Sequence, residues 1–211
     1  MLYNLFGSLS TFAPGPIPPP PYLVAGGNRS EVPYTYNTIS NGNYVRQCSI
    51  HVQSPASAKI KNPRCWFSFW NAFANGGEGY SSLRQFYLKA ALEYPLGNRY
   101  AYYFNGSDTQ LMSGGIDALC QLDNAVNIIV PANTSYWIRI YQEFTNSDGS
   151  PYTGGSFNAP MNQLLNVSRN ECSMGGTDPS DNRTVTGSMT AVAAATQVYG
   201  PTLIYGEPLT P

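Results

Sequence analysis

The stretch QFYLKAALEY, Gln85 to Tyr94, decides the fold class of this chain. Its Leu, Lys, Ala and Glu residues are good helix formers, so composition alone favours a helix. The order of the residues favours a strand instead, because successive side chains of a strand point to opposite faces. Apolar residues occupy every second position: Phe86, Leu88, Ala90, Leu92 and Tyr94. This alternation, with aromatic residues near both ends, predicts a β-strand.

The same period of two recurs in other segments after Val32. It is found in Asn43–Gln53, Arg64–Phe73, Arg99–Gly106 and Ser135–Phe144. Turns rich in Gly, Pro, Asn and Asp separate these segments. Residues 189–201 are compatible with a short helix or a small-residue strand, and we take them as the last strand. About eight or nine strands with short turns predict an all-β fold, an antiparallel β-sandwich or jelly roll over residues 32–200.

Residues 1–31 are predicted to form an extended proline-rich arm in front of this domain. Consecutive prolines fix φ and remove amide donors, which favours a polyproline II conformation. The arm is either a flexible tail or a segment that docks on a neighbouring subunit, and its low charge and large apolar side chains favour docking. The docking residues would be Leu5, Phe6, Leu9, Phe12, Pro18, Pro19, Pro20, Pro21 and Tyr22. Residues 201–211, rich in Pro and Gly, are predicted to be a linker-like C-terminal tail.

Composition excludes several classes of partner. Charged residues make up 11% of the 211 residues and the net charge is −1, whereas about 25% charged residues is usual. We therefore expect no nucleic-acid partner. No run approaches the ~20 apolar residues of a membrane-spanning helix, so we expect no membrane insertion. The first residues lack the basic region of a secretory signal peptide, which predicts synthesis in a host cytoplasm and release by another route, such as lysis.

The residue types give little support to a catalytic or metal site. His51 is the single histidine and lies among polar residues of its alternating segment, which favours a surface histidine over a general base. Neither G-x-S-x-G nor H-E-x-x-H occurs. Asp178 and Asp181 are compatible with a calcium ion, but a turn with Asx caps explains them as well. We predict a protein that is not an enzyme and has no cofactor and no metal site.

The four cysteines lie far apart in the sequence and none forms a C-x-x-C pair, so a zinc site is not expected. Buried free thiols and disulfides both remain open. Cys48 and Cys65 lie inside strand-like segments, where small buried thiols are ordinary, and this favours free thiols. The other two cysteines are Cys120 and Cys172.

Trp66, Trp70 and Trp137 form a candidate glycan platform, because the C–H faces of sugar rings pack on aromatic planes. Trp66 and Trp70 share one strand face and are two pleats apart, roughly 13–14 Å. The opposite face of this strand is also aromatic, with Phe67, Phe69 and Phe73. Burial of the tryptophans in a core covered on both sides is therefore the competing interpretation, and it is favoured by composition.

Several segments together resemble a known domain: SEVPYTYNTIS (30–40), RQCSIHV (46–52), FSFWNAFA (67–74), LKAALEYP (88–95), YYFNGSDT (102–109), IIVPANTSYWIRIY (128–141) and VYGPTLIYGEP (198–208). Over Glu31 to Pro211 the chain is similar to the β-sandwich domain that precedes the catalytic domain in some SGNH/GDSL-type hydrolases of bacteriophages and bacteria. In that family a segment similar to Tyr199–Pro211 leads into the strand of the G-D-S nucleophile. This chain contains no G-D-S, so the resemblance implies a fold and no catalytic residue.

We therefore expect a non-catalytic virion accessory or structural protein of a bacteriophage, either a capsid decoration or a tail or fibre component. Its partners would be other virion proteins or copies of itself in a homo-oligomer. Adhesion to a host surface glycan is a further expectation. The alternative is a carbohydrate-binding module cut from an SGNH-type carbohydrate esterase. A free-standing hydrolase is disfavoured, because the chain offers a single histidine.

Overall fold

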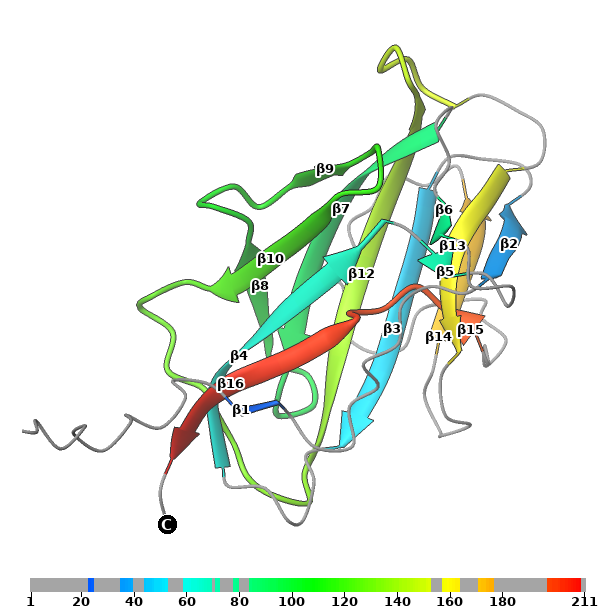
Figure 1. Ribbon diagram of the computed structural model, residues 1–211. Helices are drawn as coiled ribbons and strands as arrows, with labels where there is room; N and C mark the ends of the chain where they lie inside the picture. The colour runs from blue at the N-terminus through cyan, green and yellow to red at the C-terminus, as the bar shows by residue number, and fades with distance from the viewer. Residues whose placement is uncertain are drawn as a thin grey trace, which may run out of the picture.

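The computed structural model describes residues 23–24, 35–39, 44–52, 59–69, 71–72, 78–79, 84–152, 157–163, 171–176 and 197–209. In these residues every regular element is a β-strand and every strand pairing is antiparallel. The all-β, sandwich-like expectation is confirmed (Figure 1). Within the same part of the chain, no helix is long and apolar enough to cross a membrane.

One large sheet contains most of the strands. Its order is β1 (Leu23–Val24), β16 (Leu203–Leu209), β4 (Lys59–Ser68), β10 (Asp117–Leu122), β8 (Arg99–Tyr103), β7 (Arg84–Glu93), β12 (Ser135–Asn146), β3 (Tyr44–Val52) and β14 (Glu171–Gly176). Two further strands branch from this path, since β11 (Ile129–Val130) pairs with β4 and β9 (Gln110–Met112) pairs with β7. Two small sheets accompany it: β15 (Gln197–Val198), β13 (Phe157–Gln163) and β2 (Thr35–Ile39), and the hairpin β5 (Asn71–Ala72) with β6 (Glu78–Gly79).

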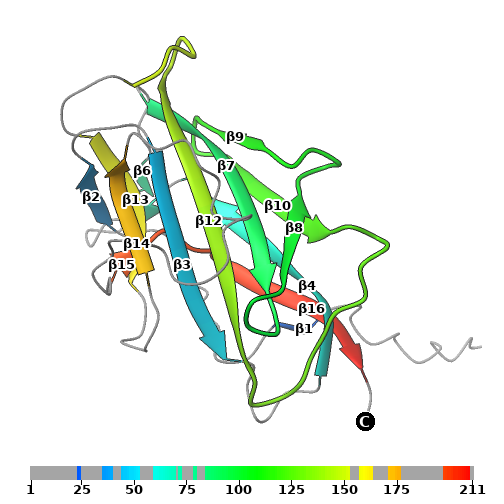
Figure 2. The same cartoon turned by 180° about the vertical axis from the view of Figure 1, so that it is seen from behind.

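The large sheet turns back on itself and forms two layers. Strands β16 and β4 cross over β7 and β12 in both views (Figures 1 and 2), and the pairing of β10 with β8 joins the layers. Aromatic rings fill the space between them. The Phe86 ring lies 5.2 Å from Phe69 and 5.5 Å from Tyr199, and Phe67 lies 5.9 Å from Tyr199. The layers are therefore held together by one continuous apolar core.

The stretch that suits both helix and strand by local criteria is a strand in the structure. It lies in β7, paired on one side with β12 and on the other with β8 and β9. Phe86, Leu88, Ala90 and Leu92 are fully buried against the other layer. Ladder hydrogen bonds and burial of this face outweigh the helix propensity of its residues, because propensity is a weak preference that tertiary context overrides.

The C-terminal stretch differs from the linker-like tail that its composition predicts. Leu203–Leu209 is β16, which pairs with β4 over most of its length, and Ile204 is fully buried. The edge of β4 would otherwise present unpaired backbone groups, and β16 satisfies them. Gly206 permits this pairing, because a Cβ there would lie 3.0 Å from both Ile60 Cβ and the Lys61 carbonyl oxygen. The glycine that suggested a linker is thus a site of close strand approach.

The predicted arm lies almost entirely outside the described residues. Only Leu23 and Val24 are described, and they pair with Gly206 and Tyr205 of β16. The docking residues from Leu5 to Tyr22 and the predicted polyproline II conformation lie outside the described part. Of the predicted last strand, Gln197 and Val198 form β15, and residues 189–196 lie outside as well.

Candidate functional site

The outward face of the layer formed by β16, β4 and β10 carries the candidate site. In β10 the alternation is strict: Ala118, Cys120 and Leu122 are buried, and the intervening Asp117, Leu119 and Gln121 are exposed. In β4 the core side holds Cys65 and Phe67, and Trp66 points outward. Because successive side chains of a strand point to opposite faces, one of every two neighbouring side chains lies on the outer surface, away from the core.

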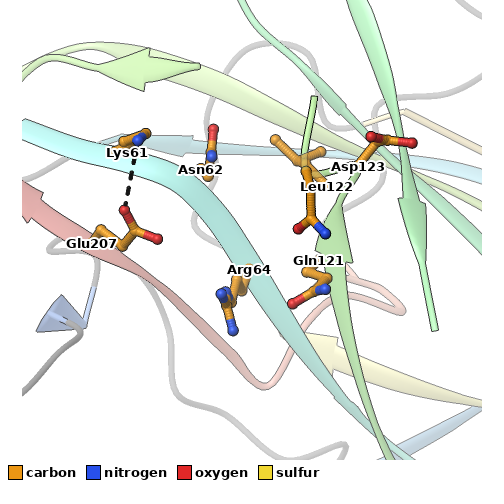
Figure 3. Close-up of a pocket in the computed structure, with 8 residues that line it drawn as sticks. Lys61, Asn62, Arg64, Gln121, Leu122, Asp123 and Glu207 are labelled. Atoms are coloured by element: carbon orange, nitrogen blue, oxygen red, sulfur yellow. Dashed lines mark ion pairs between the residues drawn. The ribbon is translucent and has the colours of Figure 1, made fainter. Parts of the chain in front are cut away.

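A polar hollow of about 210 Å³ opens on this face (Figure 3). Its side chains come from three adjacent strands and from the turn that follows β10. They are Lys61, Asn62 and Arg64 of β4, Gln121 and Leu122 of β10, Asp123 and Asn124 of the turn, and Glu207 of β16. Nearly all of these groups carry hydrogen-bond donors or acceptors, so the hollow suits a polar ligand.

Local backbone geometry shapes the rim of the hollow. Asn62 interrupts β4 with a positive φ of 46°, a conformation that Asn tolerates better than most residues. Its N–H donates to the Ile128 carbonyl at 2.7 Å, and its Oδ1 accepts the Ile128 N–H at 2.9 Å. On the opposite rim, Asp123 Oδ1 accepts the Ala125 N–H at 2.8 Å and closes the turn after β10. Both rims are therefore fixed by side chain-to-backbone hydrogen bonds.

The charges of the described residues that line the hollow balance. Lys61 and Arg64 carry two positive charges, and Asp123 and Glu207 carry two negative ones. Lys61 Nζ lies 3.9 Å from Glu207 Oε2, and both side chains are partly exposed. A partly exposed pair at this distance contributes little to stability, about 0–1 kcal/mol. The pair is consequently available to a ligand at small cost, and this lining has a net charge near zero.

Aromatic and aliphatic side chains follow the lining residues Arg64 and Gln121 along the same strands. Trp66 is 38% exposed, and its cross-strand partners are Leu119 of β10 and Leu203 of β16. Residues directly opposite in an antiparallel pair share a face, so these three form an apolar strip across the strands. Tyr205 is the partner of Arg64 in the next row. A polar hollow beside exposed aromatic residues is a common arrangement in ligand sites.

A second hollow of about 220 Å³ adjoins the first. Tyr103 of β8 and Gly106 line it, together with Gln121, Leu122, Asp123 and Asn124. The last four residues also line the first hollow. Tyr103 is the cross-strand partner of Gln121, so β10 forms the wall between the two hollows. The site therefore extends across the strands from β16 to β8.

The structure separates the residues of the predicted glycan platform. Trp66 lies on the outer face of the β16–β4–β10 layer. Trp137 belongs to β12 in the other layer, where its neighbours Tyr136 and Ile138 point into the core. Trp137 therefore lies on the opposite outer face, is half-buried, and cannot share a ligand with Trp66. Trp70 lies outside the described residues.

The structure describes only some of the other residues to which the sequence analysis gave a possible chemical role. His51 lies in β3 as the cross-strand partner of Tyr136. Cys65 and Cys120 are free, fully buried and directly opposite each other in β4 and β10, which confirms the preference for free thiols at these two positions. In the described ranges, no three His, Cys, Asp or Glu side chains gather where they could hold a metal ion. Asp178 and Asp181 lie outside those ranges.

Sequence reasoning missed the polar residues of the hollow. Lys61, Gln121 and Glu207 are ordinary surface residues when each is considered alone, and Glu207 lay in a predicted linker. The exposed positions of Asp117–Leu122 were the signal available, because strict alternation marks every second residue as outward. Nothing in the local pattern indicates that β16 brings Glu207 to Lys61.

The buried titratable groups lie on the core side of the same strands. Burial raises the pKa of the Cys120 thiol, and the adjacent Cys65 raises it further. Burial likewise raises the pKa of Tyr102, with Cys65 and Cys120 beside it. A raised pKa keeps a thiol protonated and weakens it as a nucleophile. This buried cluster of Cys65, Cys120 and Tyr102 is therefore part of the packed core. No protein-family model matches the chain, and no curated protein is similar to it in sequence.

Proposed function

We propose that this protein is a non-catalytic virion accessory protein that adheres to a carbohydrate through the hollow beside Trp66. The observation that carries the proposal is the outward polar hollow shared by β16, β4 and β10, with the exposed Trp66 two residues from Arg64 of its lining. Sugars present hydroxyl groups to polar side chains and C–H faces to aromatic rings. The side chains at this site offer both kinds of contact on one rigid sheet.

The residue inventory supports binding without catalysis. The sequence holds one histidine and neither the G-D-S nor the G-x-S-x-G nucleophile pattern. Acid–base cleavage of a glycoside needs two carboxylic groups placed on either side of the scissile bond, with one of them held protonated. In this hollow Glu207 is engaged with Lys61, and Asp123 accepts a backbone N–H. Both carboxylates therefore already have a partner within the protein.

Titration of the full chain with bacterial surface polysaccharide, followed by tryptophan fluorescence and calorimetry, tests the proposal. We expect binding by the unaltered protein and a loss of at least about tenfold in affinity, about 1.4 kcal/mol, for Trp66→Ala. Trp137→Phe is the matched control, because Trp137 lies on the opposite face, and it should bind as the unaltered protein does. Equal affinities for Trp66→Ala and the unaltered protein, with circular dichroism unchanged, would remove Trp66 from the site.

The virion location is supported by the sequence, through the low charge and the proline-rich N-terminal segment with its apolar residues. The partners would be other virion proteins or further copies of this chain. Mass spectrometry of purified particles tests the location directly. Detection of this chain at stoichiometric amounts supports the proposal, and its absence from particles that carry the gene contradicts it.

The second candidate is a glycan-binding module of an SGNH-type carbohydrate esterase. The resemblance over residues 31–211 favours it, and the hollow serves this role equally well. The reading frame of the intact gene distinguishes the two candidates. A G-D-S segment and a partner histidine encoded downstream would favour the esterase module, since the catalytic groups would then belong to a neighbouring domain.

A further inference from the structure

The two adjoining hollows indicate the charge and the length of the carbohydrate that would bind. This inference rests on the proposed function, because it concerns the same site. Gln121, Leu122, Asp123 and Asn124 line both hollows, so a ligand that fills one meets the wall of the other. The hollows are also similar in size, about 210 and 220 Å³.

The electrostatics of the shared wall select against anions. Asp123 lines both hollows, and among the described residues that line the second it is the only charged one. In the first hollow, Lys61 and Arg64 are balanced by Glu207 and Asp123. An acidic sugar would therefore meet a carboxylate in either position without an excess of positive charge to compensate it. Like charges close together raise the free energy of a complex, so the site favours a neutral ligand.

The polar and aromatic groups are distributed between the hollows. The first hollow supplies the amides of Asn62 and Gln121 and the guanidinium of Arg64. The second supplies Tyr103, a half-buried aromatic residue, with Asn124 at the shared wall. A chain of sugars that crosses Gln121 would place hydroxyl groups at the amides and one ring near Tyr103. A single sugar would reach only one of these sets.

We infer that the site binds a neutral oligosaccharide of at least two sugar units, one unit in each hollow. Linking two occupied positions makes the second contact intramolecular, which raises the affinity of the longer ligand. Affinity should therefore rise steeply from monosaccharide to disaccharide or trisaccharide and level off beyond that length. Acidic oligosaccharides of equal length should bind more weakly than neutral ones.

Calorimetric titration of the full chain with graded sets of oligosaccharides tests this inference. The neutral probes are oligomers of glucose, N-acetylglucosamine and mannose, each from monosaccharide to hexasaccharide, and the acidic probes are oligogalacturonates of the same lengths. We expect a gain of at least about tenfold from one unit to three for one neutral series. Tyr103→Ala should abolish that gain. Ser147→Ala, in the exposed turn after β12, is the control and should match the unaltered protein.

Asp123→Asn tests the charge selection separately. Asparagine keeps an Oδ1 acceptor for the Ala125 N–H, so the turn should retain its shape while the negative charge is removed. We expect this variant to bind oligogalacturonates more tightly than the unaltered protein does. Equal affinity for monosaccharide and trisaccharide, or preference of the unaltered protein for the acidic series, would overturn the inference while leaving carbohydrate adhesion standing. Absence of binding to every probe and to the surface polysaccharide would overturn both.

Discussion

Glu93 and Arg139 form an ion pair whose two side chains are fully buried. Arg139 Nε donates to Glu93 Oε2 at 2.5 Å, and the Gly97 N–H donates to Glu93 Oε1 at 2.9 Å. Glu93 ends β7 and Arg139 lies within β12, so the pair connects these neighbouring strands and also holds the turn that leads to β8. Removal of one charge from such a pair leaves the other charge buried without compensation.

Glu93→Gln should therefore lower the free energy of unfolding by about 3–5 kcal/mol. Lys89→Gln is the matched control, since Lys89 and Asp108 lie 4.0 Å apart with both side chains partly exposed. A pair of that kind contributes about 0–1 kcal/mol. Urea denaturation of the two variants measures both values. Similar small losses for the two variants would show that the buried pair is no more important than the exposed one.

At the scale of elements, β16 determines whether the candidate site exists. It pairs with β4 on one edge, takes β1 on the other, and contributes Glu207 to the hollow. Tyr199, just before it, packs on Phe67 and Phe86, and its hydroxyl donates to the Ser68 carbonyl at 3.0 Å. The C-terminal segment is thus part of both the sheet and the core.

Truncation after Thr202 should abolish cooperative folding, because it exposes the edge of β4 and removes the fully buried Ile204 from the core. Truncation after Leu209 keeps the whole of β16 and should leave stability unchanged. Thermal unfolding followed by circular dichroism compares the two. A cooperative transition near that of the full chain in the shorter variant would mean that the segment behaves as a linker.

At the scale of the molecule, the core contains several titratable groups whose pKa values are raised. Burial is the largest cause for Tyr102, Tyr136, Tyr199 and Cys120. Each group is neutral when protonated and is kept so by the folded state. The folded state therefore retains these protons at a pH where the unfolded chain has released them.

Stability should consequently fall at alkaline pH. The contribution of these groups is fully present below their unfolded pKa values, about 8.5 for Cys and 10 for Tyr, and is lost as pH rises above them. Each group lowers the free energy of unfolding by about 1.4 kcal/mol per pH unit in that window. Urea denaturation between about pH 8 and 11 measures the slope, and Tyr199→Phe should reduce it by about one proton. Constant stability across this range would contradict the prediction.

Much of the fold follows from local patterns in the sequence. The alternation in Gln85–Tyr94 predicted β7, and the alternation in Ser135–Phe144 predicted β12. Of the residues discussed at the candidate site, only Trp66 was predicted from the sequence. Its polar partners were missed because Lys61, Gln121 and Glu207 come from three segments that are far apart in the sequence, and no local pattern states which strands become neighbours.

The sequence by itself determined that this chain forms antiparallel strands with one apolar face, because side-chain alternation is a local property that neighbouring residues express directly. Only the tertiary structure decided that β16 is the partner of β4 rather than a linker, and that Trp66 and Trp137 lie on opposite faces. Strand order depends on which exposed edges and apolar faces satisfy one another across the whole chain. The position of the hollow follows from that order, since its walls exist only where β16, β4 and β10 meet.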